Sequence, residues 1–173
     1  MTVKLTVKDI AVFGMLGAMM YLSKLVMEWL PNVHLIGVFI IASTVVYRAK
    51  ALYPLYIFVL LCGLFGGFSL WWIPYLYVWT ALWGVTMLLP KTIGAKWRPL
   101  VYMCLCAAHG FCFGILYAPA QALLFGFDFE QTVAWVIAGL PFDLTHGIGN
   151  FVAGILIVPL IALLKRIERT SHI

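Results

Sequence analysis

The chain has 173 residues, of which 65% are hydrophobic and only 10% are charged. A soluble domain carries roughly 25% charged residues, so this composition excludes a soluble globular protein and indicates an integral membrane protein. The net charge of +5 does not point to nucleic acid, because the basic residues lie between long apolar runs, as they do in membrane proteins.

The apolar segments predict an all-α bundle of six transmembrane helices, since about 20 residues cross a hydrocarbon core of roughly 30 Å. In chain order, we expect a single domain over residues 1–173 with spans at about 9–29, 33–47, 51–68, 70–89, 99–125 and 140–164. Thr6 and Asp9 have the spacing of a capping box at the start of the first span. Residues 126–139 are expected to form a loop with a short interfacial helix, and Pro141 is expected in the first turn of the sixth span.

The distribution of basic residues sets the predicted orientation. Ten of the eleven Lys and Arg residues fall on one side of the six-span arrangement, and Lys24, within the first span, is the exception. The opposite side carries Glu28, Asp128 and Glu130. By the positive-inside rule, both termini are predicted to be cytoplasmic.

Three polar residues share one face of the sixth predicted span. Asp143, His146 and Asn150 are spaced i, i+3, i+7. An ionisable group at bilayer depth costs roughly 2.5–3.5 kcal/mol, so it normally faces protein or a wet cavity. We therefore predict that this face lines a small-molecule pocket. Alternatively, the macrodipole of a first helical turn favours Asp143, and His146 and Asn150 form hydrogen bonds between helices.

Aromatic residues near the outer end of the fourth span are candidates for stacking. Trp71, Trp72 and Tyr75 offer flat walls for a heteroaromatic solute, although Trp and Tyr also populate the interfacial belt of membrane proteins. Adjacent Trp residues point in different directions, so we expect one of the two to face the pocket. Gln121, near the outer end of the fifth span, is predicted to add hydrogen bonds.

Three further polar residues are placed at the entrance of this pocket. Asn32 and His34 lie in the first outer loop and are expected to gate it. Lys24 either pairs with Glu28 or Asp143, or extends its ammonium outward to the interface.

Signatures of catalysis and of metal binding do not occur in the sequence. There is no P-loop, GxSxG, HExxH or paired intramembrane Asp motif, so the chain itself is not expected to hydrolyse ATP or to be an enzyme. His34, His109 and His146 lack the spacing of metal ligands, and the four cysteines lie in apolar runs without CxxC spacing. We predict no cofactor, no metal site and no disulfide.

Small residues on the first span are the candidates for partner docking. Gly14, Gly17 and Ala18 form a small-residue stripe that lets another helix approach closely, either within the bundle or in another membrane subunit.

Taken together, these features resemble the substrate-binding S component of an energy-coupling factor (ECF) transporter. The segments that carry the resemblance are LPNVHLIGVFIIASTVVYRAKALYPLY at 30–56, FGGFSLWWIPYLYVW at 65–79 and GLPFDLTHGIGN at 139–150. The docking motif of that family is AxxxA on the first span, where this sequence has Gly14-x-x-x-Ala18.

The resemblance implies a multi-pass protein of the bacterial cell membrane with an outward pocket built from the first outer loop and the outer ends of spans four to six. It also implies partners, a scaffold transmembrane subunit and two cytoplasmic ATPases, and delivery of the solute by reorientation in the membrane. Substrates in the family are water-soluble vitamins, their precursors, related heterocycles and, in some branches, metal ions. A carboxylate beside aromatic walls favours a neutral or cationic nitrogen heterocycle such as a nucleobase-like compound, whereas Lys24 would receive an anionic group.

Two other functions fit the same residues. One is a stand-alone small transporter or channel driven by protons through Asp143 and His146. The other is a small intramembrane enzyme with His146 as base and Asp143 as the group that orients it.

Overall fold

The computed structural model describes residues 5–30 and 32–169, and its regular elements are all helical. The expectation of an all-α chain is confirmed for this part of the protein. The helices are α1 (Val7–Val26), α2 (Ile36–Tyr47), α3 (Leu52–Gly66), α4 (Tyr75–Leu88), α5 (Arg98–Phe111), α6 (Phe113–Phe125), α7 (Phe129–Ala153) and α8 (Ile157–Arg169). Three short 3-10 turns join some of them: η1 (Arg48–Ala51), η2 (Leu70–Trp72) and η3 (Gly154–Leu156).

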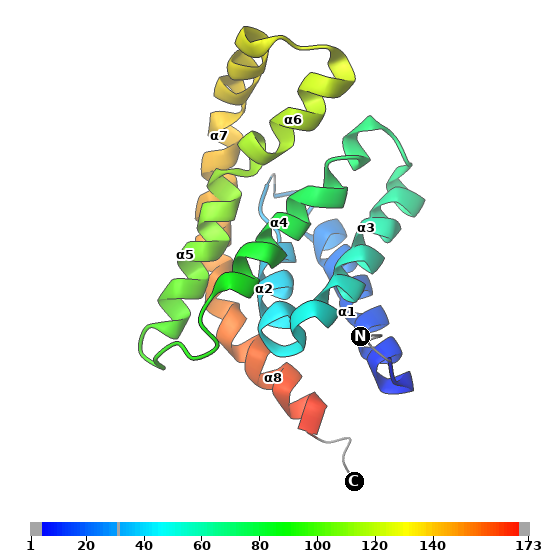
Figure 1. The fold of residues 1–173 in the computed structure, drawn as a ribbon, viewed down its shortest axis with the longest axis vertical. Coiled ribbons are helices and arrows are strands. Elements are labelled where there is room, and N and C mark those ends of the chain that lie inside the picture. Colours follow the sequence, from blue (N-terminus) through cyan, green and yellow to red (C-terminus); the bar gives the residue numbers. More distant parts are fainter. Residues whose placement is uncertain (1–4, 31, 170–173) are drawn as a thin grey trace.

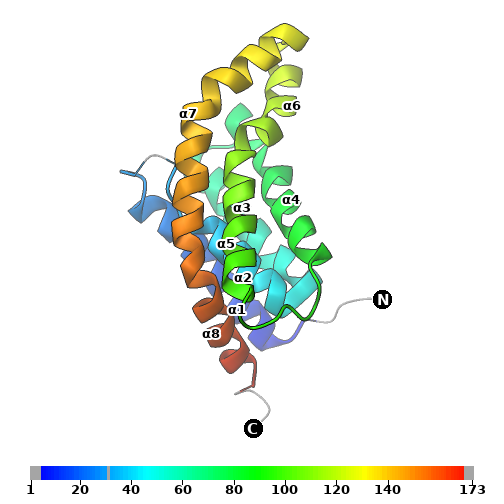
Figure 2. The ribbon, with the colours of Figure 1, turned by 90° about the vertical axis from the view of Figure 1, so that its left-hand side faces the viewer.

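The chain runs back and forth along the long axis of the molecule. In Figure 1, α1, α3 and the α5–α6 pair run one way, and α2, α4 and the α7–α8 pair run the other way. Helix α2 lies at the centre, and all of its residues from Ile36 to Thr44 are buried. Its sequence permits this position, because a helix that is apolar on every side is stable either among other helices or against lipid. The α6–α7 hairpin projects beyond the rest of the bundle (Figure 2).

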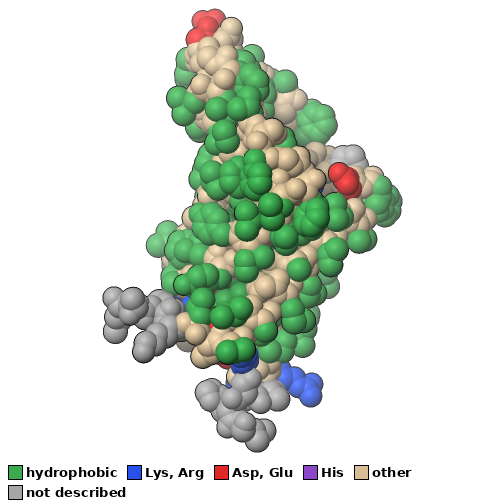
Figure 3. All heavy atoms as spheres, turned by 90° about the vertical axis from the view of Figure 1, so that its right-hand side faces the viewer, with side chains coloured by type: hydrophobic (Ala, Val, Ile, Leu, Met, Phe, Trp, Pro, Cys, Tyr) green, Lys and Arg blue, Asp and Glu red, His purple; other side chains and the backbone are tan. Residues whose placement is uncertain are grey.

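Four helical stretches are long and apolar enough to cross a membrane, judged by length and composition within the described residues. They are Val7–Val26, Ile36–Gly66, Arg98–Phe125 and Phe129–Arg169. The face drawn in Figure 3 fits such a setting: hydrophobic side chains cover its middle, Lys and Arg gather at one end, and Asp and Glu lie toward the other. Within Ile36–Gly66 the chain reverses at Arg48, which has a φ of 54° and whose guanidinium donates to the carbonyl of Met87 at 2.9 Å.

Residues 126–139 were expected to form a loop with a short interfacial helix, and that expectation was wrong, because residues 129–139 belong to the long helix α7. Asp128 and Gln131 form a capping box that begins the helix at Phe129. The helix then continues through Pro141, which is therefore an interior residue and not part of a first turn. Interior prolines are tolerated in membrane helices because neighbouring groups satisfy the freed backbone. Helices α5 and α6 meet at Cys112 and together form the helical stretch Arg98–Phe125, which is close to the span expected over 99–125.

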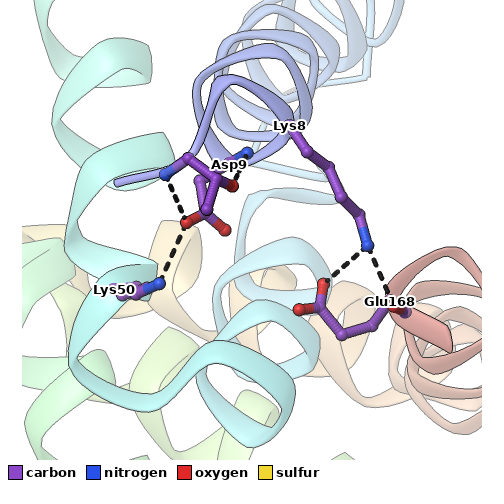
Figure 4. A network of polar contacts seen from close by, with 5 residues as sticks. Lys8, Asp9, Lys50 and Glu168 are labelled. Carbon is purple, nitrogen blue, oxygen red and sulfur yellow. Dashed lines mark hydrogen bonds and ion pairs between the residues drawn. The ribbon is translucent and has the colours of Figure 1, made fainter. Parts of the chain in front are cut away.

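Ion pairs connect three elements at the end of the molecule where the described chain begins and ends (Figure 4). The predicted capping box of Thr6 and Asp9 is present at the start of α1. The Asp9 carboxylate also lies 2.9 Å from the Lys50 ammonium of η1, and Lys8 lies 3.5 Å from the carboxylate of Glu168 on α8. This network fixes the lower end of α1 against η1 and α8.

Candidate functional site

Two adjoining cavities lie at the far end of α1, away from this ion-pair network. The histidine cavity has a volume of 190 Å³ and is lined by Lys24, Met27, Glu28, Leu30, Asn32, Val33, His34, Tyr75, Phe113 and His146. The aromatic cavity has a volume of 440 Å³ and is lined by Tyr21, Lys24, Leu25, Glu28, Cys62, Phe65, Gly66, Trp71 and Tyr75. The two linings share Lys24, Glu28 and Tyr75, so the cavities adjoin and together make up the candidate site.

A larger groove, of 530 Å³, runs along α3. Its lining is almost entirely apolar and includes Leu52, Ile57 and Leu60. Two of its polar side chains already have partners, since Lys50 pairs with Asp9 and the Tyr56 hydroxyl donates to the carbonyl of Leu76. Specific recognition of a water-soluble molecule requires a few convergent polar groups, which the paired cavities have.

Two histidine rings meet edge to face in the histidine cavity. The centroids of His34 and His146 are 4.6 Å apart at an interplanar angle of 78°. His146 is only 3% exposed, and its ring also contacts Phe113 with centroids 4.8 Å apart. Among the described residues, neither Nε2 of His146 nor Nδ1 of His34 has a hydrogen-bond partner. A buried polar atom without a partner costs about 1–3 kcal/mol, so these two nitrogens are the atoms best prepared to bind a solute or water.

The surroundings of His34 keep its imidazole neutral. His34 lies in the loop between α1 and α2, and its ring contacts the indole of Trp79 with centroids 5.6 Å apart. Burial lowers the pKa of His34 to about 4, and the nearby His109 and Lys24 act in the same direction. A neutral imidazole has one donor and one acceptor nitrogen, so His34 can bind an uncharged polar group.

A third histidine, His109, lies behind these two rings. Its Nε2 lies 3.0 Å from the carbonyl oxygen of Val78, and its ring packs against Trp79. Within residues 5–30 and 32–169, no three His, Cys, Asp or Glu side chains are grouped so that they could hold a metal ion.

Of the three polar residues predicted on one face of α7, one lines a cavity and two contact neighbouring helices. All three residues are buried, but only His146 lines the histidine cavity. The carboxylate of Asp143 accepts from the backbone N–H of Gly114 at 3.0 and 3.1 Å, in the first turn of α6. The amide of Asn150 donates to the carbonyl of Cys106 on α5 at 3.2 Å. These two residues hold α7 against α5 and α6 and are absent from both cavity linings.

The aromatic candidates also divide. Trp71 lines the aromatic cavity, Tyr75 lines both cavities, and their rings meet edge to face with centroids 5.4 Å apart. Trp72 turns away from the cavities, because its indole N–H donates to the carbonyl of Val59 at 2.7 Å and its ring packs against Phe68. Gln121 is partly exposed on α6, outside both linings.

The entrance candidates Asn32, His34 and Lys24 all line the histidine cavity. Lys24 forms no ion pair with Glu28 or Asp143 in the described structure. Sequence reasoning left Glu28 and Phe113 out of the site. For Glu28 a signal was available, because the predicted span over 9–29 places it four residues after Lys24 on the same face, although α1 itself ends at Val26.

The small-residue stripe on α1 serves two different surfaces. Gly17 is buried against α3, where an added Cβ would overlap Ile57. At Gly14 an added Cβ would meet nothing within 4 Å, and Ala18 is partly exposed. Gly17 therefore packs within the bundle, whereas Gly14 lies against open space.

Comparisons with known proteins add no family assignment. A scan against protein-family models, a search of curated proteins and a search of solved structures gave no match to this chain.

Proposed function

We propose that this chain is the solute-binding membrane subunit of an ECF-type importer. The observation that carries the proposal is the pair of cavities at the upper end of α1, where unpaired nitrogens of His34 and His146 share one lining with Lys24 and Glu28. A small concave site with a few convergent polar groups and aromatic walls is the usual form of a small-molecule binding site.

The proposed topology has six spans: α1, α2, α3, α4, the α5–α6 pair and the α7–α8 pair. The basic loops between α2 and α3 and between α4 and α5, together with both termini, would be cytoplasmic. In this orientation the cavities open toward the outside of the cell, as uptake requires.

Transport would need energy from partner subunits, because the chain carries no nucleotide-binding motif. The proposed partners are a scaffold membrane subunit and two cytoplasmic ATPases, and the open surface at Gly14 and Ala18 on α1 is the proposed contact with the scaffold. The proposed solute is a water-soluble vitamin, a vitamin precursor or a nucleobase-like heterocycle.

Native mass spectrometry of the purified chain in lipid nanodiscs tests the binding role. We expect a retained small molecule whose affinity falls about tenfold or more in His146→Phe. This variant keeps an aromatic ring at the position but removes the unpaired Nε2. Gln121→Ala is the matched control, because Gln121 lies outside both linings. Absence of any bound solute would refute the proposal.

Uptake measurements test the dependence on partners. Cells in which the Walker A lysine of the ATPase subunits is replaced, so that these subunits are inactive, should lose uptake of the retained molecule. Uptake that persists would instead identify a stand-alone transporter, and chemical conversion of the molecule by the purified chain would identify an enzyme.

A further inference from the structure

Two opposite charges face the same space in the candidate site. Lys24 lies in the last turn of α1 and Glu28 lies four residues further on, in the turn that follows the helix, and both line both cavities. Opposite charges at this spacing attract each other when both lie on one helix. Here, within the described residues, neither side chain forms an ion pair with the other or with any third residue. Lys24 is partly buried, and Glu28 is exposed at the mouth.

The rest of the lining carries no fixed charge that would balance a charged solute. Among the described residues, its remaining polar side chains are Asn32, the imidazoles of His34 and His146, the tyrosines, Cys62 and the indole N–H of Trp71. A solute with only an anionic group would pair with Lys24 but would lie beside the carboxylate of Glu28. A purely cationic solute would meet the reverse arrangement, so a singly charged solute would gain one favourable pair and meet one like charge, whereas a solute with both charges could pair with both residues.

The walls of the aromatic cavity indicate the shape of the solute. Tyr21, Phe65, Trp71 and Tyr75 surround this cavity, and aromatic side chains pack favourably against planar rings. The volume of 440 Å³ lies in the lower part of the range of about 300–1,000 Å³ that is usual for small-molecule pockets, and the volume of 190 Å³ lies below that range. A compact molecule with one ring system fits these dimensions.

We propose that the solute is a compact ring-bearing zwitterion whose anionic group binds the Lys24 ammonium and whose basic nitrogen binds the Glu28 carboxylate. Its ring lies against Trp71 and Tyr75, and His34 and His146 bind its uncharged polar groups. This inference rests on the proposed solute-binding function and narrows its substrate class. It replaces the choice between a cationic heterocycle and an anion with a molecule that carries both charges.

Matched probes separate the effect of charge from that of the ring. The first series is phenylalanine, phenethylamine and 3-phenylpropionate, and the second is tryptophan, tryptamine and indole-3-propionate. Each series presents one ring as a zwitterion, a cation and an anion, and binding to the chain in nanodiscs is measured by calorimetry. In at least one series we expect the zwitterion to bind about tenfold or more tightly than either singly charged analogue, because each charged pair strengthens binding by about that factor.

Neutral variants assign each charge to its partner. Lys24→Gln should remove the advantage of the zwitterion over the amine, and Glu28→Gln should remove its advantage over the acid. Lys91→Gln and Glu130→Gln are matched controls, because both residues are exposed and outside the two linings. Thermal unfolding of each variant checks that it is folded.

The charge of the molecule retained during purification decides the question if no probe binds. A retained solute with both an acidic and a basic group supports the inference. A retained solute with one charge or none, equal binding of a singly charged probe, or a preference for the zwitterion that survives both Gln variants would overturn it and leave the solute-binding function standing. The absence of any retained solute and of any probe binding would overturn both proposals.

Discussion

Asp143 provides the sharpest test of the structure, because the sequence assigns it to the pocket and the structure assigns it to a helix terminus. The first turn of α6 has no side-chain cap from its own N-cap residue, Cys112. The Asp143 carboxylate of α7 instead accepts the N–H of Gly114 at 3.0 and 3.1 Å. We therefore expect Asp143→Ala to reduce the free energy of unfolding and to leave solute affinity unchanged.

The expected loss is about 2 kcal/mol. Loss of an N-cap costs about 0.5–2 kcal/mol, and a buried N–H left without its partner costs about 1–3 kcal/mol. Asp143→Asn should lose less, because its amide oxygen still accepts from Gly114. Reversible unfolding in mixed detergent micelles, followed by tryptophan fluorescence, measures the change.

A double-mutant cycle tests the contact itself. In Gly114→Ala the new Cβ would overlap the Asp143 carboxylate, so this variant should also be destabilised. The double variant Gly114→Ala/Asp143→Ala should lose less than the sum of the single variants, since removal of the carboxylate makes room for the methyl group. If Asp143→Ala unfolded like the native protein but lost its solute, the carboxylate would belong to the pocket and our assignment would be wrong.

Three further predictions concern packing, the ion-pair network and pH. Gly17→Leu should lower stability by about 1–3 kcal/mol because its side chain would overlap Ile57, whereas Gly14→Leu should be tolerated; equal thermal unfolding of the two variants would contradict the α1–α3 packing. Lys50→Met should lower the free energy of unfolding by about 1–2 kcal/mol, because it leaves the buried Asp9 carboxylate without its cation. An unchanged midpoint of thermal unfolding would count against the ion-pair network in Figure 4. Acidification from pH 6.5 to about 4 should lower the thermal midpoint, because the unfolded chain protonates His34 at its ordinary pKa of 6.5 while the pKa of the folded state is about 4. His34→Gln should reduce this slope, and identical slopes would refute the pKa assignment.

The sequence by itself determined the features that depend on local chemistry. The apolar runs specified helices, and the Thr6–Asp9 spacing specified the start of α1. The shared face of Asp143, His146 and Asn150 correctly indicated that all three side chains are buried. Helical periodicity reveals which side of a helix avoids lipid, because every residue on that side is subject to the same cost of burial in hydrocarbon.

Only the tertiary structure decided which neighbour each buried group contacts. Helical periodicity does not distinguish a residue that lines a cavity from one that contacts an adjacent helix. Asp143 binds the backbone N–H of Gly114, whereas His146, one turn along the same face, lines the histidine cavity. The two neighbouring tryptophans separated for the same reason, since the carbonyl that binds Trp72 comes from another helix, α3. Contacts between helices depend on their relative positions, which are set by the packing of the whole bundle and are not encoded in any single segment.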